Sequence, residues 1–197
     1  MKTPVLKEIY NTQVVPELKK LYKYANVHEV PTVEKIVINT RIKAEAEKQH
    51  IADLQKDIAA VTGQKPVVNK ARISIANFKV REGMPLGVSV TLRGASMWEF
   101  LFRLVNVTLP NIRDFRGVAR KLDGRGNYTL GVTDHTIFPE INVETGRKAV
   151  GMDITIVTSA ANDEQARELL RLLGMPFRQS TRQVVQAAAA PAEVANA

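Results

Sequence analysis

The net positive charge of this chain, which could bind an anionic ligand, is concentrated in one basic stretch. Between Thr62 and Gly131 the sequence carries twelve lysines and arginines against four carboxylates, a net charge of +8. The whole chain also has a formal charge of +8, so the residues outside this stretch are neutral in sum. A short charged run is usually a solvated surface. An imbalance over about a third of the chain is instead typical of a surface that contacts a polyanion, so we predict nucleic-acid binding here.

The residue patterns of catalytic and metal sites are missing from the sequence. The three histidines, His28, His50 and His135, lie far apart and lack metal-ligand spacing. Asp134 precedes His135, but an ordinary surface or core pair explains this dipeptide better than catalysis does. There is no cysteine, which excludes disulfides and thiolate sites. We therefore predict a protein that is not an enzyme and that uses no cofactor or metal.

The composition indicates a globular protein without a membrane segment. Hydrophobic residues make up 45% of the chain, which is enough for a core. No apolar run approaches the roughly 20 residues that span a bilayer, and the first residues do not resemble a secretory signal. The basic residues also do not lie on one amphipathic helix, which disfavours a membrane-surface protein. We expect a cytoplasmic protein, since the lack of cysteine suits a reducing compartment.

Periodicity predicts an α+β fold with a mainly antiparallel sheet, helices packed on one face, and a free polar face with basic loops for RNA. The most informative segment is residues 86–93, where apolar positions alternate with Gly87, Ser89, Thr91 and Arg93. Further strands are predicted over 33–40, 66–69, 73–78, 128–132 and 152–159. Helices are predicted over 3–24, with a break at Pro16, and over 44–61, 96–108 and 162–173.

Two basic loops interrupt this pattern. Residues 70–83 are bounded by strand-like runs, which predicts a protruding hairpin arm. Its cations are Lys70, Arg72, Lys79 and Arg81. Residues 111–126 are rich in glycine, which predicts a long mobile loop, and such loops are usually functional. Its cations are Arg113, Arg116, Arg120, Lys121 and Arg125.

The domain organisation follows from the same reading. Residues 1–180 are predicted to form a single RNA-binding domain. Residues 181–197 are rich in alanine and glutamine and are expected to be a disordered tail, because they have little to bury.

A set of short motifs occurs in order along the chain. They are Thr62-Gly-Gln-Lys-Pro66, Lys70-Ala-Arg72, Val90-Thr-Leu-Arg-Gly94, Met97-Trp-Glu-Phe100, Ile112-Arg-Asp-Phe-Arg-Gly117, Asp123-Gly-Arg-Gly-Asn-Tyr128 and Phe138-Pro-Glu-Ile141. No single motif is decisive, but the ordered set is highly specific. From about Tyr10 to Arg178 the chain closely resembles the bacterial large-subunit ribosomal protein L-five family.

This resemblance implies a structural protein of the large ribosomal subunit. It implies binding of 5S rRNA in the central protuberance and contacts to large-subunit rRNA and to neighbouring 5S-binding ribosomal proteins. The family's 5S-binding positions correspond to Asn39, Gln64 and Thr91, and Lys65 and Arg93 stand beside them in the sequence. By the same resemblance the arm reaches toward P-site tRNA, and the glycine-rich loop reaches toward a small-subunit head protein across an intersubunit bridge.

The resemblance departs from the family at one place. After Asn39 the family usually has Met-Gly-x-Gly-Glu-Ala, whereas this chain has Thr40-Arg-Ile-Lys-Ala44. Two glycines that would let the backbone approach RNA closely are therefore missing. Arg41 and Lys43 could supply phosphate contacts in their place.

An alternative function uses the same platform. The sequence would also suit a free-standing RNA chaperone or regulator, and sedimentation with large subunits at moderate salt distinguishes the two.

Overall fold

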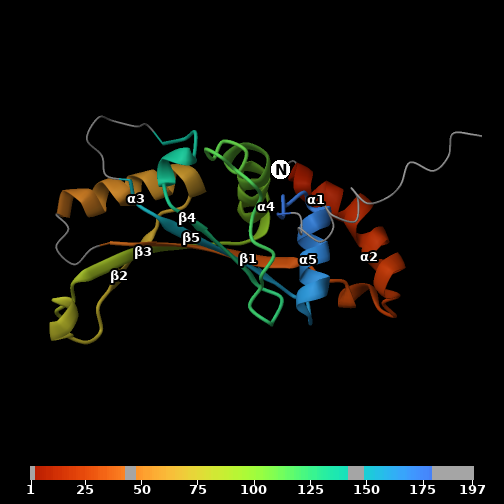
Figure 1. Cartoon of the computed structure of the whole chain (residues 1–197), viewed down its shortest axis with the longest axis horizontal. Coiled ribbons are helices and arrows are strands. Elements are labelled where there is room, and N and C mark those ends of the chain that lie inside the picture. The colour runs from red at the N-terminus through yellow and green to blue at the C-terminus, as the bar shows by residue number, and fades with distance from the viewer. Residues whose placement is uncertain (1–2, 43–47, 142–148, 179–197) are drawn as a thin grey trace, which may run out of the picture.

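The protein is described by a computed structural model that covers residues 3–42, 48–141 and 149–178. Its centre is an antiparallel five-stranded sheet in the spatial order β2-β3-β1-β5-β4 (Figure 1). The strands are β1 (Val33–Arg41), β2 (Val67–Lys70), β3 (Pro85–Leu92), β4 (Tyr128–Val132) and β5 (Met152–Thr158). The α-helices are α1 (Val5–Ile9), α2 (Val15–Tyr22), α3 (Lys48–Thr62), α4 (Gly94–Arg103) and α5 (Asp163–Leu172). The α+β class predicted from periodicity is therefore confirmed.

One side of the sheet is covered by helices and the other is open. Figure 1 shows α3 and α4 on the same side of the strands, while α1, α2 and α5 gather at the end of the sheet far from the β2–β3 hairpin. Strand residues alternate accordingly, because successive side chains point to opposite faces. In β1, Ile36 and Ile38 are buried, whereas Asn39 and Arg41 are exposed. We call the side of the sheet opposite α3 and α4 the polar face.

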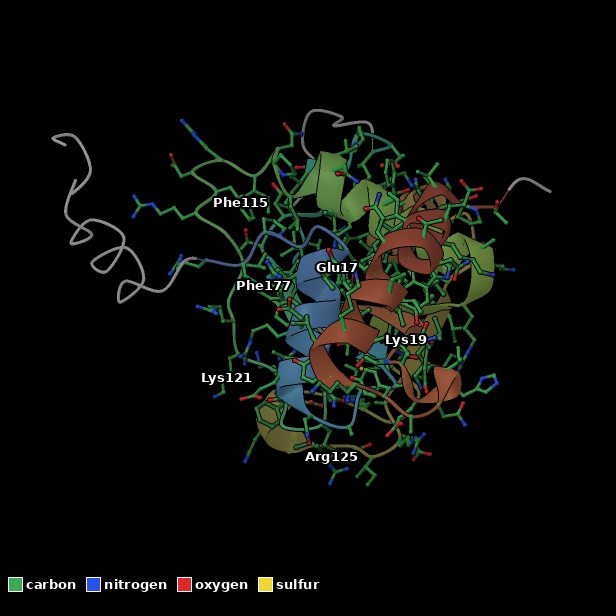
Figure 2. All side chains as sticks on the ribbon, turned by 90° about the vertical axis from the view of Figure 1, so that its right-hand side faces the viewer. Glu17, Lys19, Phe115, Lys121, Arg125 and Phe177 are labelled. Atoms are coloured by element: carbon green, nitrogen blue, oxygen red, sulfur yellow. The ribbon has the colours of Figure 1, made fainter. Side chains whose placement is uncertain are left out.

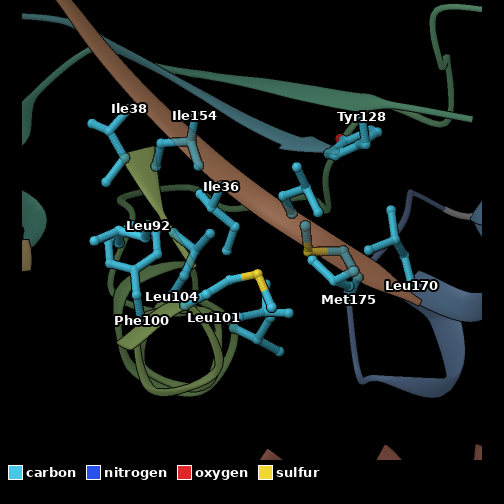
Figure 3. Packing of buried hydrophobic residues seen from close by; sticks show 14 of the residues in the cluster. Ile36, Ile38, Leu92, Phe100, Leu101, Leu104, Tyr128, Ile154, Leu170 and Met175 are labelled. Carbon is cyan, nitrogen blue, oxygen red and sulfur yellow. The ribbon is translucent and has the colours of Figure 1, made fainter. Parts of the chain in front are cut away.

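The core lies between the sheet and α4 (Figure 3). Side chains from β1, β3 and β5 meet a stripe of α4 and the π-helical turn that continues it. They are Ile36, Ile38, Leu92 and Ile154 on the sheet and Phe100, Leu101 and Leu104 on the helix, all almost fully buried. Burying each such side chain is worth about 1.5–3 kcal/mol. This packing fixes which face of the sheet stays open.

Several predicted boundaries need correction. Residues 73–78 do not form a strand, because the chain reverses there: Ile75 and Val80 form an isolated bridge around a 3₁₀ turn (Ala76–Phe78). Helix α4 begins at Gly94 rather than at residue 96. Pro16 lies in the first turn of α2, after a π-helical turn (Tyr10–Val14) that continues directly from α1.

Some predictions fall outside the described residues. These are the disordered tail over 181–197, the phosphate contact of Lys43, and the start of the helix predicted over 44–61, which the structure describes from Lys48.

Candidate nucleic-acid interface

The polar face presents its side chains in rows that cross the strands. Directly paired residues of antiparallel strands lie on the same side of a sheet, so the strand register defines each row. One row consists of Thr91, Val37, Thr155 and Thr129, on β3, β1, β5 and β4. The next consists of Val67, Ser89, Asn39, Asp153 and Gly131, from β2 to β4. Apart from two valines these positions carry hydroxyls, an amide, a carboxylate or no side chain, so the face can exchange hydrogen bonds with a polar ligand.

The residues that the resemblance assigns to 5S rRNA come together on this face. Asn39 and Thr91 are both exposed and lie in adjacent rows of neighbouring strands. Such diagonal neighbours are about 7–8 Å apart. Gln64 and Lys65 are exposed in the turn before β2, at the end of that strand nearest Thr91. Segments that are far apart in the sequence are therefore adjacent in space.

Two side chains hold the turn before β2 and its neighbouring strand in place. The Thr62 hydroxyl donates to the Gln64 carbonyl at 3.1 Å and accepts the Gln64 N–H at 3.3 Å. On the sheet itself, the Asn69 amide donates to the Ser89 hydroxyl at 3.0 Å. These contacts fix the backbone that presents Gln64 without using its side chain.

Lys35 is a candidate residue that the sequence reading missed. Ile36 pairs with Leu92, the last residue of β3, and Arg93 follows it in extended backbone as the N-cap of α4, so Lys35 and Arg93 lie at the same end of the two paired strands. Neither cation forms an ion pair within the described residues. Like charges held near one another repel, and a bound phosphate would relieve that repulsion. The sequence could have identified Lys35, because the alternation of side chains along the strand places it on the same face as Val37 and Asn39.

The arm is a real hairpin, as predicted, but its tip is apolar as well as basic. The Ala71 N–H donates to the Met84 carbonyl at 2.8 Å, which extends the β2–β3 ladder outward. Lys70, Arg72, Lys79 and Arg81 are exposed along it. The same hairpin exposes Ile73 by 72% and Phe78 by 67%. Its side chains can therefore meet both phosphates and unstacked bases or ribose.

The glycine-rich loop differs from the mobile loop predicted from the sequence, because it is anchored to the C-terminal segment. The Val118 N–H donates to the Pro176 carbonyl at 2.8 Å, and the Arg178 N–H donates to the Val118 carbonyl at 2.9 Å. Gly117 has a φ of +90°, and a Cβ on it would lie 2.8 Å from the Arg178 nitrogen, so only glycine fits. Nothing local in the sequence indicates this pairing.

A second set of contacts anchors the end of the same loop. The Asp163 carboxylate accepts the backbone N–H groups of Gly124 at 3.1 Å and of Gly126 at 2.9 Å. The Asp123 carboxylate accepts hydrogen bonds from the Asn127 side chain and backbone and from the Arg125 N–H, and these hold the pKa of Asp123 below its ordinary value.

The loop cations remain exposed on this anchored backbone. They are Arg113, Arg116, Arg120, Lys121 and Arg125. Figure 2 shows Lys121 and Arg125 at the edge of the molecule beside α5.

One arginine of the basic stretch, Arg103, is engaged within the protein and is only partly exposed. The Arg103 guanidinium pairs with the Glu140 carboxylate and donates to the Val61 carbonyl at 3.0 Å. It therefore links α4 to the end of α3 and to the segment around Glu140, and is not available to a ligand in the way the exposed cations are.

The His135 side chain of the Asp134–His135 dipeptide lies in the core. His135 is only 2% exposed, and its Nε2 lies 3.6 Å from the Asp57 carboxylate. Its Nδ1 accepts the Val150 N–H at 3.2 Å and lies 3.7 Å from the Asp134 carboxylate. Within the part of the chain that the structure describes, no group of three histidine or acidic side chains could hold a metal ion, and no helix is long and apolar enough to cross a bilayer.

The fold and this surface are those of an α+β protein whose open sheet face and basic loops suit contact with a polyanion. The family described as ribosomal protein L5 matches residues 26–81, and the C-terminal part of the same ribosomal protein family matches residues 85–177. The large ribosomal subunit protein uL5 of Halothermothrix orenii is 54% identical over 177 residues, which are 89% of this chain and 99% of that protein. The uL5 protein of Rubrobacter xylanophilus is 54% identical over 175 residues, 88% of this chain and 97% of that protein. That of Thermotoga maritima is 49% identical over 175 residues, 88% and 95% of the two chains.

The chain therefore belongs to the uL5 family of large-subunit ribosomal proteins. It is a structural constituent of the ribosome and not an enzyme, as the sequence predicted.

Proposed function

We propose that the polar face of the sheet binds 5S rRNA and helps to attach it in the central protuberance. Asn39, Gln64 and Thr91 make the specific contacts, and the cations Lys65 and Arg93 meet phosphates, with Lys35 added to them. The observation that supports this proposal is the strand register, which puts exposed Asn39 and Thr91 on one face, together with the exposed Gln64 and Lys65 in the turn before β2. Hydroxyl and amide side chains of this kind suit ribose 2′-hydroxyls and base edges, while cations suit phosphates.

The remaining basic surfaces have separate partners in this proposal. The hairpin arm contacts P-site tRNA, and the glycine-rich loop contacts a small-subunit head protein across an intersubunit bridge. Large-subunit rRNA and neighbouring 5S-binding ribosomal proteins border the same domain, residues 1–180, on ribosomes in the cytoplasm. The support for this division is spatial: the arm extends from the β2–β3 edge of the sheet, while the loop lies at the other end beside α5 (Figures 1 and 2).

The test is 5S rRNA binding by the Thr91→Val variant. This change keeps the volume of the side chain and removes one hydroxyl from the polar face, so it should cost about 1–2 kcal/mol of binding free energy and leave the fold intact. Thr12→Val is the matched control, because the exposed Thr12 hydroxyl donates to the nearby Glu8 carbonyl and lies on the N-terminal helical segment, away from the polar face. Unchanged affinity of Thr91→Val would remove Thr91 from the interface.

Salt dependence and sedimentation complete the test. If about six cations contact phosphates, log affinity should fall with log salt with a slope of several units, and a flat response would contradict phosphate binding. A protein that leaves large subunits at moderate salt would instead be the free-standing RNA chaperone or regulator.

A further inference from the structure

The centre of the polar face carries an amide and a carboxylate side by side. Asn39 on β1 pairs directly with Asp153 on β5, and both residues are exposed. Directly paired residues have Cβ atoms about 5 Å apart on the same face. Asp153 is also the only carboxylate in the two rows that the register defines from β3 to β4.

Neither of these side chains is used within the described structure. The Asp153 carboxylate forms no hydrogen bond or ion pair with any described residue, and neither does the Asn39 amide. Their row neighbours do not compete for them. Ser89 exchanges hydrogen bonds with Asn69 at 3.0 and 3.3 Å, which turns it away from Asn39.

The far side of the carboxylate is left open by a glycine. Gly131 pairs with Asp153, and a Cβ on Gly131 would lie 3.6 Å from Asp153 Oδ1. A larger residue at position 131 would therefore contact the carboxylate and screen it. At the Gly131 position, therefore, no side chain lies against Oδ1.

A carboxylate on this surface needs a partner that donates. An ionised aspartate only accepts hydrogen bonds, and it repels the phosphates that the surrounding cations attract. The Watson–Crick edge of guanine has two adjacent donors, N1–H and the N2 amino group, next to the O6 acceptor. Uracil places acceptors on both sides of its single donor, and cytosine and adenine each offer one amino group beside an acceptor. An aspartate next to an asparagine therefore matches guanine better than the other bases.

We propose that Asn39 and Asp153 together recognise the Watson–Crick edge of one unpaired guanine. Asp153 accepts from N1–H and the N2 amino group, and the Asn39 amide donates to O6. Such an edge is accessible only where the base is unpaired, as in loops and bulges of RNA. This inference rests on the proposed function of the polar face and adds the base that one part of it reads.

The test uses the full chain, a 5S rRNA transcript and the Asp153→Asn variant. Removal of one negative charge should strengthen binding to any polyanion if the carboxylate only repels phosphates. The proposal predicts the opposite sign: a loss of affinity of about tenfold or more, as expected for a lost bidentate contact to a base. Glu99→Gln is the matched control, because it removes the same charge from an exposed position on α4, away from the polar face. An unchanged or higher affinity of Asp153→Asn would overturn the proposal.

A second experiment identifies the donor. Each loop guanosine of the transcript is replaced in turn by inosine, which lacks the N2 amino group. One replacement should weaken binding of the wild-type protein about tenfold and leave binding of Asp153→Asn unchanged. If instead a 2′-deoxy substitution shows this coupling, the donor is a ribose hydroxyl and the guanine assignment is wrong. If Thr91→Val weakens binding and no guanosine is coupled to Asp153, the inference fails while the proposed function stands.

Discussion

Replacement of Asp163 by alanine should loosen the glycine-rich loop and leave the polar face intact. Asp163 is the first residue of α5, and its two oxygens accept the Gly124 and Gly126 N–H groups at 3.1 and 2.9 Å. A hydrogen bond to a charged acceptor is worth about 1.5–3 kcal/mol when it is sheltered from water. The bond to buried Gly126 is sheltered and that to exposed Gly124 is not, so we expect a loss of about 2 kcal/mol of unfolding free energy.

The assay is thermal unfolding combined with amide hydrogen exchange. A loss of this size corresponds to a fall in Tm of about 4–8 °C for a chain of this length. The control is Glu164→Ala, which removes the neighbouring charge from the same first turn of α5 but from a side chain that accepts no hydrogen bond from the described residues of the loop. Amide protection at Gly126 should fall in Asp163→Ala alone. An equal fall in Tm for both variants, or unchanged protection at Gly126, would refute the proposed anchoring.

Two further predictions concern a buried phenol and the arm. Tyr128→Phe removes the O–H that donates to the Ala119 carbonyl at 2.8 Å and should cost about 1 kcal/mol in chemical denaturation. Burial raises the pKa of Tyr128 to about 12, above its unfolded value of about 10. The stabilisation by the protonated phenol is therefore complete below about pH 10 and is lost as the pH rises toward 12, in the wild type but not in the variant. Lys79→Glu combined with Arg81→Glu should spare 5S rRNA occupancy of purified large subunits but weaken tRNA retention or subunit association, because it places negative charge near phosphate. Loss of 5S rRNA before either of these would assign the arm to the 5S site.

The alternation of side chains along single strands was sufficient to predict the polar face. Residues 86–93 alternate between apolar and polar positions, and the burial of β3 follows that pattern from Val88 to Leu92, whereas Leu86 is half-buried and Gly87 is buried. The same reasoning failed at residues 73–78, because the apolar residues at the tip of a hairpin are exposed rather than packed on a core. Periodicity reports which residues share a side, but it does not report whether anything covers that side.

Contacts between distant segments were not predictable in this way. Lys35 was missed because Arg93 follows the end of another strand, β3, whose last residue pairs with Ile36 beside Lys35. The anchoring of the glycine-rich loop was missed because its partners, Asp163 and Pro176, follow it by dozens of residues. Glycines suggest a flexible backbone when read locally. In the folded chain Gly117 and Gly126 are instead the positions where two backbones approach too closely for a side chain.

The net charge of the basic stretch therefore combines cations with different tasks. The Arg103 guanidinium pairs with Glu140 and donates a hydrogen bond to the Val61 carbonyl at the end of α3. It therefore stabilises the packing of helices against the sheet. The loop cations stand on a backbone that is already ordered, so less conformational entropy is lost when a partner binds them. Those of the arm stand on a hairpin that leaves the sheet edge, with the isolated Ile75–Val80 bridge at its tip. A partner that binds the glycine-rich loop can thus bind a preformed surface. A partner that binds the arm must also order the exposed tip of the arm. Binding at the arm should therefore depend more strongly on the conformation of the free protein than binding at the loop.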